Sequence, residues 1–254
     1  MHQKSYNRFW FFNFLPIWYA THKLKRLKEA QHWDDDRYYK KMYAIPLLTH
    51  ENVGDKLAML RDYLTDEISK HKATARVIDL ATGRGYQARN IYARGYKNVY
   101  GSDIQVSRVA EAKQQNIDTP IHFAVADMRR LPYRSGSADA IVVSGALHDL
   151  KPAEVKTSLK ECHRVLRVGG RLIVLEPRYL GDLPYILVRK AYAFSCGLLD
   201  ESVNMQDFLQ LDLVSLGAHI GFTLLRQQTV WHAILSLYTF AKSGENDNGT
   251  GWGE

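Results

Sequence analysis

Acidic side chains and glycines are spaced for chemistry between residues 76 and 103. Asp79 ends a β-branched run, Gly83 and Gly85 follow it closely, and Asp103 comes after a predicted helix. Glycine lets backbone N–H groups approach a ligand more closely than a Cβ atom would allow. A strand, a glycine turn and a more distant acid are together typical of a nucleotide-binding site.

The spacing Gly83-x-Gly85-x-x-Ala88 with Asp103 fits the dinucleotide fingerprint literally, but Asp79 indicates another ligand. Nicotinamide and flavin cofactors would present phosphate near Asp79. A carboxylate is better suited to a cationic group, such as the ammonium group of S-adenosylmethionine. The residues therefore favour S-adenosylmethionine over a dinucleotide.

Together with three later stretches, this segment resembles the class I S-adenosylmethionine-dependent methyltransferases. Ala81 stands where the family motif has its first glycine, a replacement typical of the ubiquinone and menaquinone (type 11) branch, and Val168 replaces a common proline. The resemblance covers residues 75–177 well. The later stretches resemble the family's second to fifth strands with their loops: 99–103, 123–133, 138–144 and 164–177.

The resemblance implies a Rossmann-like, doubly wound α/β fold, with a mainly parallel seven-stranded sheet and an N-terminal helical cap. The alternation of predicted strands and helices after residue 75 favours the same fold. Apolar spacing and helix-ending residues predict helices at 54–70, 86–94, 106–114, from Pro152 to Gly169-Gly170, and at 205–216. An antiparallel hairpin of 222–226 with 233–241 is expected at the sheet edge.

We expect three parts in the chain. Residues 1–50 form an aromatic, basic cap or arm, and residues 51–242 form the methyltransferase domain. Within that domain, the apolar stretch 183–200 is expected to be a lid over the substrate pocket. Residues 243–254 lack a hydrophobic pattern, which predicts a disordered tail.

The cofactor ligands follow from the resemblance, position by position. For each acid, the alternative is a role in capping its own turn. The resemblance places the methionine end of the cofactor at Asp79, Ala81, Gly83 and Gly85, its amino-acid part also at the Ser144 backbone, the ribose at Asp103 and Ile104, and the adenine at Asp127 and Met128.

Candidate catalytic residues follow the predicted fourth and fifth strands. His148 stands where active sites of open α/β sheets form and could act as a general base, or it could be a packing group. Glu176 and Tyr179 lie on the same rim and are either catalytic or loop anchors. The remaining histidines show no ligand spacing, so we expect no metal.

The N-terminal arm is both aromatic and basic. Seven of the eleven residues from Phe9 to Tyr19 are aromatic, and much of the formal charge of +7 lies within residues 1–30. The arm is too short and too interrupted to span a bilayer. It is either a cap over the cofactor site or an interfacial membrane anchor. Two cysteines favour a reducing compartment, so we expect a cytoplasmic protein that the arm could associate with a membrane.

The leading hypothesis is a methyltransferase acting on a small apolar acceptor such as a quinone, a lipid or an aromatic metabolite. One alternative is a nicotinamide-dependent oxidoreductase. An RNA methyltransferase is another, although the positive charge gathers in the arm and no RNA module is recognisable. A non-catalytic binding or scaffold protein is the third.

Overall fold

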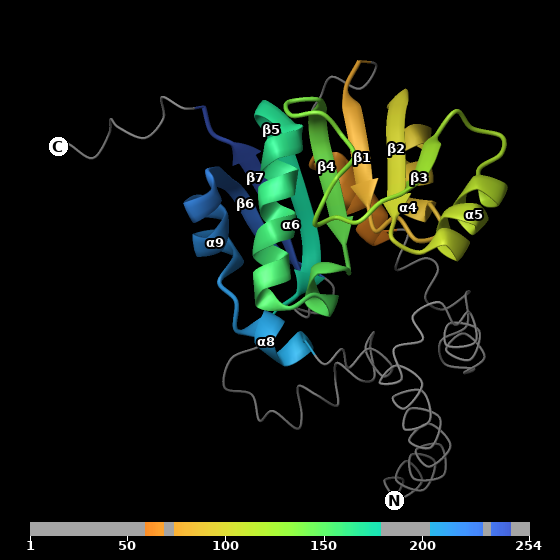
Figure 1. Ribbon diagram of the computed structural model, residues 1–254. Helices are drawn as coiled ribbons and strands as arrows, with labels where there is room; N and C mark the ends of the chain where they lie inside the picture. The colour runs from red at the N-terminus through yellow and green to blue at the C-terminus, as the bar shows by residue number, and fades with distance from the viewer. Residues whose placement is uncertain (1–58, 69–73, 179–203, 231–234, 245–254) are drawn as a thin grey trace, which may run out of the picture. The chain divides into compact units, whose positions relative to one another are not determined.

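The described residues are built on a seven-stranded sheet with the strand order β3-β2-β1-β4-β5-β7-β6 (Figure 1). The computed structural model describes residues 59–68, 74–178, 204–230 and 235–244. Only β7 runs antiparallel to its neighbours, β5 and β6. The predicted mainly parallel, Rossmann-like sheet is thus confirmed. The predicted arm at 1–50, the lid at 183–200 and all but the first two residues of the 243–254 tail lie outside the described residues.

The elements alternate along the chain as predicted. The strands are β1 (Arg76–Leu80), β2 (Asn98–Asp103), β3 (His122–Val125), β4 (Ala138–Ser144), β5 (Leu166–Pro177), β6 (Phe222–Val230) and β7 (Leu235–Lys242). The helices are α4 (Tyr86–Ala93), α5 (Val106–Gln115), the 3-10 helix η2 (Leu147–Asp149), α6 (Pro152–Val165), α8 (Met205–Leu209) and α9 (Leu213–Ile220). Residues 59–66 are also helical.

The chain changes direction across the sheet between β1 and β4. From β1 it proceeds through β2 to the edge strand β3, and then returns to β4 on the other side of β1. Right-handed crossovers therefore place α4 and α5 on one face of the sheet and α6 on the other. Figure 1 shows α6 in front of the sheet and the helix of residues 59–66 behind it. Ligands of open α/β sheets bind at such a reversal, outside the carboxyl ends of the strands.

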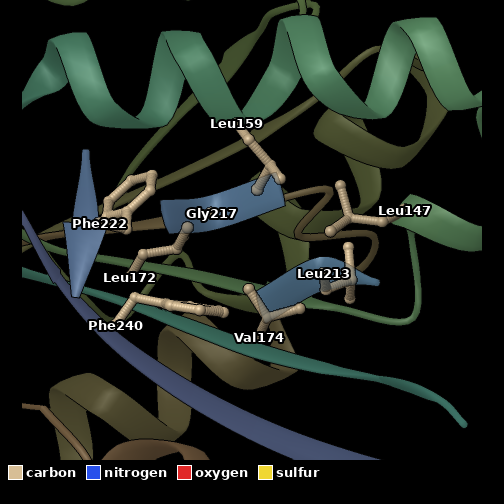
Figure 2. A pocket seen from close by; sticks show the side chains of 8 residues that line it. All are labelled: Leu147, Leu159, Leu172, Val174, Leu213, Gly217, Phe222 and Phe240. Atoms are coloured by element: carbon tan, nitrogen blue, oxygen red, sulfur yellow. The ribbon is translucent and has the colours of Figure 1, made fainter. Parts of the chain in front are cut away.

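The face of the sheet beneath α6 carries the main hydrophobic core. Figure 2 shows a seam within it where α6 and α9 pack against β5, β6 and β7. All of its lining side chains are apolar, and it has no room for a water molecule. The seam is therefore packed core and not a ligand site. The lining residues are Leu147, Leu159, Leu172, Val174, Leu213, Gly217, Phe222 and Phe240.

The single helix predicted at 205–216 is wrong, because α8 and α9 are separate helices. The Asp212 side chain accepts hydrogen bonds from the N–H groups of Val214 at 3.0 Å and Ser215 at 3.1 Å. Asp212 is thus the N-cap that begins α9, since its carboxylate satisfies two otherwise unpaired donors. The apolar spacing continues across this break, so periodicity alone concealed it.

Two other predicted helix ends are too late. The helix of residues 59–66 stops before Glu67, whose carboxylate bonds Arg226 and Thr239 on the terminal hairpin. Helix α6 ends at Val165, not at Gly169-Gly170, because buried Leu166 already pairs with Ala138 in the sheet.

The predicted hairpin is confirmed, with β6 extending beyond residue 226 to Val230. No helix within the described ranges is long and apolar enough to cross a membrane.

Candidate active site

Asp79 lies near the end of β1, and its carboxylate binds groups in the turn and helix that follow. Its Oδ2 atom accepts hydrogen bonds from the Thr82 hydroxyl at 2.5 Å and from the Ala88 N–H at 3.1 Å. The residue is only 2% exposed, and this burial raises the pKa of its carboxyl to about 7, although both hydrogen bonds oppose the shift. The carboxylate therefore ties the start of α4 to the end of β1.

The three small residues of the turn, Ala81, Gly83 and Gly85, differ in conformation and in surroundings. Ala81 adopts a left-handed φ of 53°, which is unfavourable for a residue with a Cβ atom. A Cβ atom on Gly83 would meet no described atom within 4 Å, whereas one on Gly85 would lie 2.8 Å from both Phe123 and Asn116. Gly83 therefore leaves open space for a ligand to approach the backbone. Gly85 makes room for packing against α5 and β3.

Asp103 connects the glycine turn to the end of β2. Its Oδ2 atom accepts the Gly83 N–H at 2.9 Å, and its Oδ1 atom accepts the Gln105 N–H at 2.9 Å. The neighbouring Ile104 side chain is 58% exposed, in contrast to Asp103 at 8%. The carboxylate is thus held in place by backbone donors beside an exposed apolar side chain, an arrangement that fits a ribose with an attached base.

Asp127 follows β3 and is engaged by a cation. The Arg129 guanidinium contacts both carboxylate oxygens of Asp127, with Nη2 2.7 Å from Oδ2. The hydrogen bonds from Arg129 hold the pKa of Asp127 below its ordinary value. The next residue, Met128, packs partly buried against the core under α6.

His148 and Glu176 meet at the ends of β4 and β5. The imidazole Nδ1 of His148 lies 2.7 Å from Oε2 of Glu176, which is fully buried. The other carboxylate oxygen accepts the N–H groups of Ala146 at 2.8 Å and Leu147 at 2.7 Å. On its other side the imidazole meets the Phe208 ring edge-on, with ring centroids 6.3 Å apart. Glu176 thus fixes the orientation of the imidazole and of the loop that carries it.

The structure brings the predicted site residues that it describes together at the carboxyl ends of the parallel strands. The glycine turn follows β1, Asp103 and the half-buried Ser144 are the last residues of β2 and β4, and the His148–Glu176 pair joins the loop after β4 to the end of β5. Gly145, directly after Ser144, has a φ of 62°, and a Cβ atom there would meet no described atom within 4 Å. Tyr179 lies outside the described residues, so its predicted role remains a prediction.

Sequence reasoning missed Arg61, a residue of the helix behind the sheet. Its guanidinium lies over the Tyr86 ring, 5.0 Å from the centroid, at the first residue after the glycine turn. Its positive charge also opposes the effect of burial on the pKa of Asp79. No local pattern marks this arginine, because its partners belong to another helix.

The groups around the glycine turn fit S-adenosylmethionine. The described ranges contain no cluster of three or more histidine, cysteine or acidic side chains that could hold a metal. By contrast, the open backbone at Gly83, the fixed carboxylate of Asp103 and the cation of Arg61 suit a ligand with hydroxyl groups and a zwitterionic end.

Comparison with known proteins finds related sequences over part of the chain. A family model described as a methyltransferase domain matches residues 78–174. The demethylmenaquinone methyltransferase of Thermus thermophilus is 33% identical over 151 residues, which are 56% of this chain and 68% of that protein. The protein of the same name from Beutenbergia cavernae is 39% identical over 101 residues, 40% of each chain. The chain thus spans less than half of the length of this second relative.

Solved structures share the fold at low sequence identity. The PH0226 protein of Pyrococcus horikoshii superposes with a TM-score of 0.60 and 16% identity, covering 80% of this chain and 99% of that one. At this identity, the likeness supports the arrangement of strands and helices and no finer property.

Proposed function

This chain belongs to the class I S-adenosylmethionine-dependent methyltransferases, and we propose that it methylates a small apolar acceptor of the quinone type. The names of the relatives support the acceptor class. The observation that carries the proposal is the Asp103 carboxylate, fixed by the Gly83 and Gln105 N–H groups at the switch point of the sheet.

The cofactor would be held by groups at the ends of four strands. Asp103 would accept hydrogen bonds from the ribose hydroxyls beside Ile104, and Asp127 and Met128 would contact the adenine. Arg61 would pair with the methionine carboxylate, while the negative charge of Asp79 favours the ammonium group. The backbone after β4, at Ser144, would complete the amino-acid end. When bound, S-adenosylmethionine supplies an electrophilic methyl group on a sulfonium.

His148 would serve the acceptor. Because the Glu176 carboxylate accepts at Nδ1, we assign the Nδ1–H tautomer to His148, and Nε2, 4.0 Å from Asp149 Oδ1, would be the nitrogen that takes the proton. Removing a hydroxyl proton from a quinol-like ring makes the ring and its oxygen better nucleophiles. Glu176 would hold the imidazole and stabilise the positive charge that it gains. The alternative is a packing role for His148 beside Phe208.

We also propose that residues 1–30 bring the apolar acceptor to the site, either as a lid or as a contact to a membrane surface. The support is the sequence alone: seven aromatic side chains within eleven residues need a cover, and the adjacent lysines and arginines suit an anionic surface. Deleting residues 1–30 should leave cofactor affinity within a few-fold and sharply lower activity on the acceptor. Flotation with anionic liposomes, with and without salt, separates membrane contact from a lid.

Two measurements test the proposed function. Calorimetry should detect binding of S-adenosylhomocysteine, and transfer of a labelled methyl group should be measured with a short-chain demethylmenaquinol and with tRNA. No binding would overturn the cofactor assignment. Binding without transfer to the demethylmenaquinol would overturn the acceptor class, and transfer to tRNA would replace it by a nucleic acid.

A further inference from the structure

The outer side of α6 and the loop beside it carry a group of exposed cations, here called the basic face. Its members are Arg130, Arg134, Lys151, Lys156 and Lys160. We propose that the basic face is a docking surface for an anionic lipid membrane, separate from residues 1–30. The choice of a lipid partner rests in part on the proposed apolar acceptor.

The loop and the helix form one continuous surface. Arg164 on α6 donates to the Leu131 carbonyl at 3.0 Å, and the Leu131 N–H donates to Glu161 on the same helix at 2.7 Å. These two bonds hold the loop along the second half of α6. Arg130 and Arg134, which are exposed on this loop, therefore lie at the side of the helix.

The lysines of the basic face lie on the solvent side of α6, the helix in front of the sheet in Figure 1. Lys156 and Lys160 are four residues apart and therefore share one side of the helix. The buried residues of α6 lie on its opposite side, against the sheet. Lys151 directly precedes the helix and follows η2, which carries His148, by two residues. The basic face thus begins beside the proposed acceptor side.

The charge around α6 is unbalanced. Residues 127–167 contain eight lysines and arginines against five acidic residues, a net charge of +3. Acids beside the helix are bound to other arginines: Glu154 to Arg129, Glu161 to Arg164 and Asp139 to Arg167. Within the described part of the chain, no cation of the basic face pairs with an acid at 4.0 Å or less.

The arginines at α4, on the other side of the sheet, have acidic partners. Arg89 binds Asp118 at 2.7 Å, and Arg94 binds Asp62 at 3.1 Å. A surface that only faces water commonly intersperses both signs of charge in this way. The unpaired positive charge on α6 therefore suits a partner that is itself anionic.

The composition of the basic face favours a lipid surface over a protein or a nucleic acid. No large apolar side chain described for residues 126–167 is exposed. Protein interfaces need a buried apolar or aromatic centre, and single-stranded nucleic acids are bound by stacking on aromatic rings. Anionic head groups need neither, because a cluster of about four to eight lysines and arginines is attracted to them by charge. A bilayer would also dissolve the proposed apolar acceptor.

The test measures binding of the full chain to phosphatidylcholine vesicles with and without phosphatidylglycerol, by flotation at low and high salt. We expect phosphatidylglycerol to strengthen the binding and salt to weaken it. The double variant Lys156→Gln with Lys160→Gln should bind the anionic vesicles about 25-fold more weakly, since each charge near the surface contributes about fivefold. Lys156→Arg with Lys160→Arg keeps both charges and should bind within about twofold of the intact chain.

A matched control removes two charges from the side of the sheet that carries α4 and α5. Lys97 and Lys113 are exposed there, and Lys97→Gln with Lys113→Gln should bind the anionic vesicles within about twofold of the intact chain. Residues 1–30 are present in every variant, so the comparison measures the contribution of α6 alone. Melting temperatures and unchanged affinity for S-adenosylhomocysteine confirm that each variant is folded.

Several outcomes would overturn the inference. One is that phosphatidylglycerol does not strengthen the binding, and another is that the glutamine variant at 156 and 160 binds like the intact chain. An equal loss in the control at 97 and 113 would show that net charge alone explains the binding. Titration with tRNA is the last arm: if the glutamine variant loses affinity for tRNA and not for vesicles, the partner is a nucleic acid.

Vesicle binding and methyl transfer can fail independently. Flotation requires neither the cofactor nor the acceptor, so it tests the basic face whether or not methyl transfer is detected. Vesicle binding that depends on Lys156 and Lys160, without transfer to the demethylmenaquinol, would support the docking surface and overturn the acceptor class. Transfer without such binding would overturn the docking surface alone.

Discussion

The cofactor side and the acceptor side of the site are both built on a buried carboxylate at a strand end, but they use it differently. Asp79, near the end of β1, accepts hydrogen bonds from a hydroxyl in the following turn and from an N–H in the first turn of α4, three and nine residues away. Glu176, near the end of β5, binds a loop 28 to 30 residues earlier and orients His148. On the cofactor side, the buried carboxylate thus fixes the backbone of the glycine turn and of the start of α4. On the acceptor side, the buried carboxylate fixes one side chain, His148, whose position depends on residues far away in the sequence.

The largest effect should follow from His148→Ala, which removes the group that the acceptor side serves to orient. We expect turnover to fall by about 10²–10⁴, while affinity for S-adenosylhomocysteine changes little. Turnover with a quinol acceptor and calorimetry together give the two values. A loss of less than tenfold would favour the packing role beside Phe208. The difference between the cofactor side and the acceptor side would then have no counterpart in turnover.

The buried carboxyl of Asp79, on the cofactor side, should make the stability of the protein depend on pH. Burial raises the pKa of Asp79 to about 7, so between about pH 4 and 7 the folded chain binds a proton that the unfolded chain has released. This group therefore lowers stability as pH rises through that window. The unfolding free energy of Asp79→Asn minus that of the intact chain should therefore increase by on the order of 2–4 kcal/mol from pH 5 to pH 8.

Denaturant titrations of both proteins at the two pH values provide the measurement. All other titrating groups contribute equally to the unfolding free energy of both proteins, so their contributions cancel in the difference. A difference that is the same at both pH values would mean that Asp79 ionises like an exposed acid, and the comparison with Glu176 would lose its basis.

Asp103→Ala should have a smaller effect, confined to binding. The lost charge-assisted hydrogen bonds should weaken S-adenosylhomocysteine by about 10- to 100-fold, as measured by calorimetry, without unfolding the domain. Gly83→Val should be worse, because its side chain would fill the open space over the turn. Unchanged affinity in Asp103→Ala would remove this residue from the site.

The smallest effect concerns the strain in the turn. Ala81→Gly relieves a left-handed conformation that costs about 1–2 kcal/mol, but it also gives the unfolded chain more freedom. We expect a net gain in unfolding free energy of up to about 1 kcal/mol. Ala93→Gly, at the exposed end of α4, is the matched control and should lose about 0.5–1 kcal/mol. Equal losses in both variants would show that the turn is not strained.

The sequence by itself determined the order of elements from residue 76 to 177 and the strand ends that carry the site. Hydrophobic periodicity, glycine turns and strand-ending acids are local signals, so β1, β2, β4 and the glycine turn could be predicted closely. The same local signals missed the break at Asp212, because a side-chain cap can begin a new helix within an unbroken apolar pattern.

Only the tertiary structure decided which partners the charged side chains have. Arg61 reaches Tyr86 from another helix, Arg129 is shared between Asp127 and α6, and the Glu176 carboxylate is turned toward His148. Spacing along the chain cannot show these pairs, because the direction of a side chain depends on the packing of segments that lie far apart in sequence.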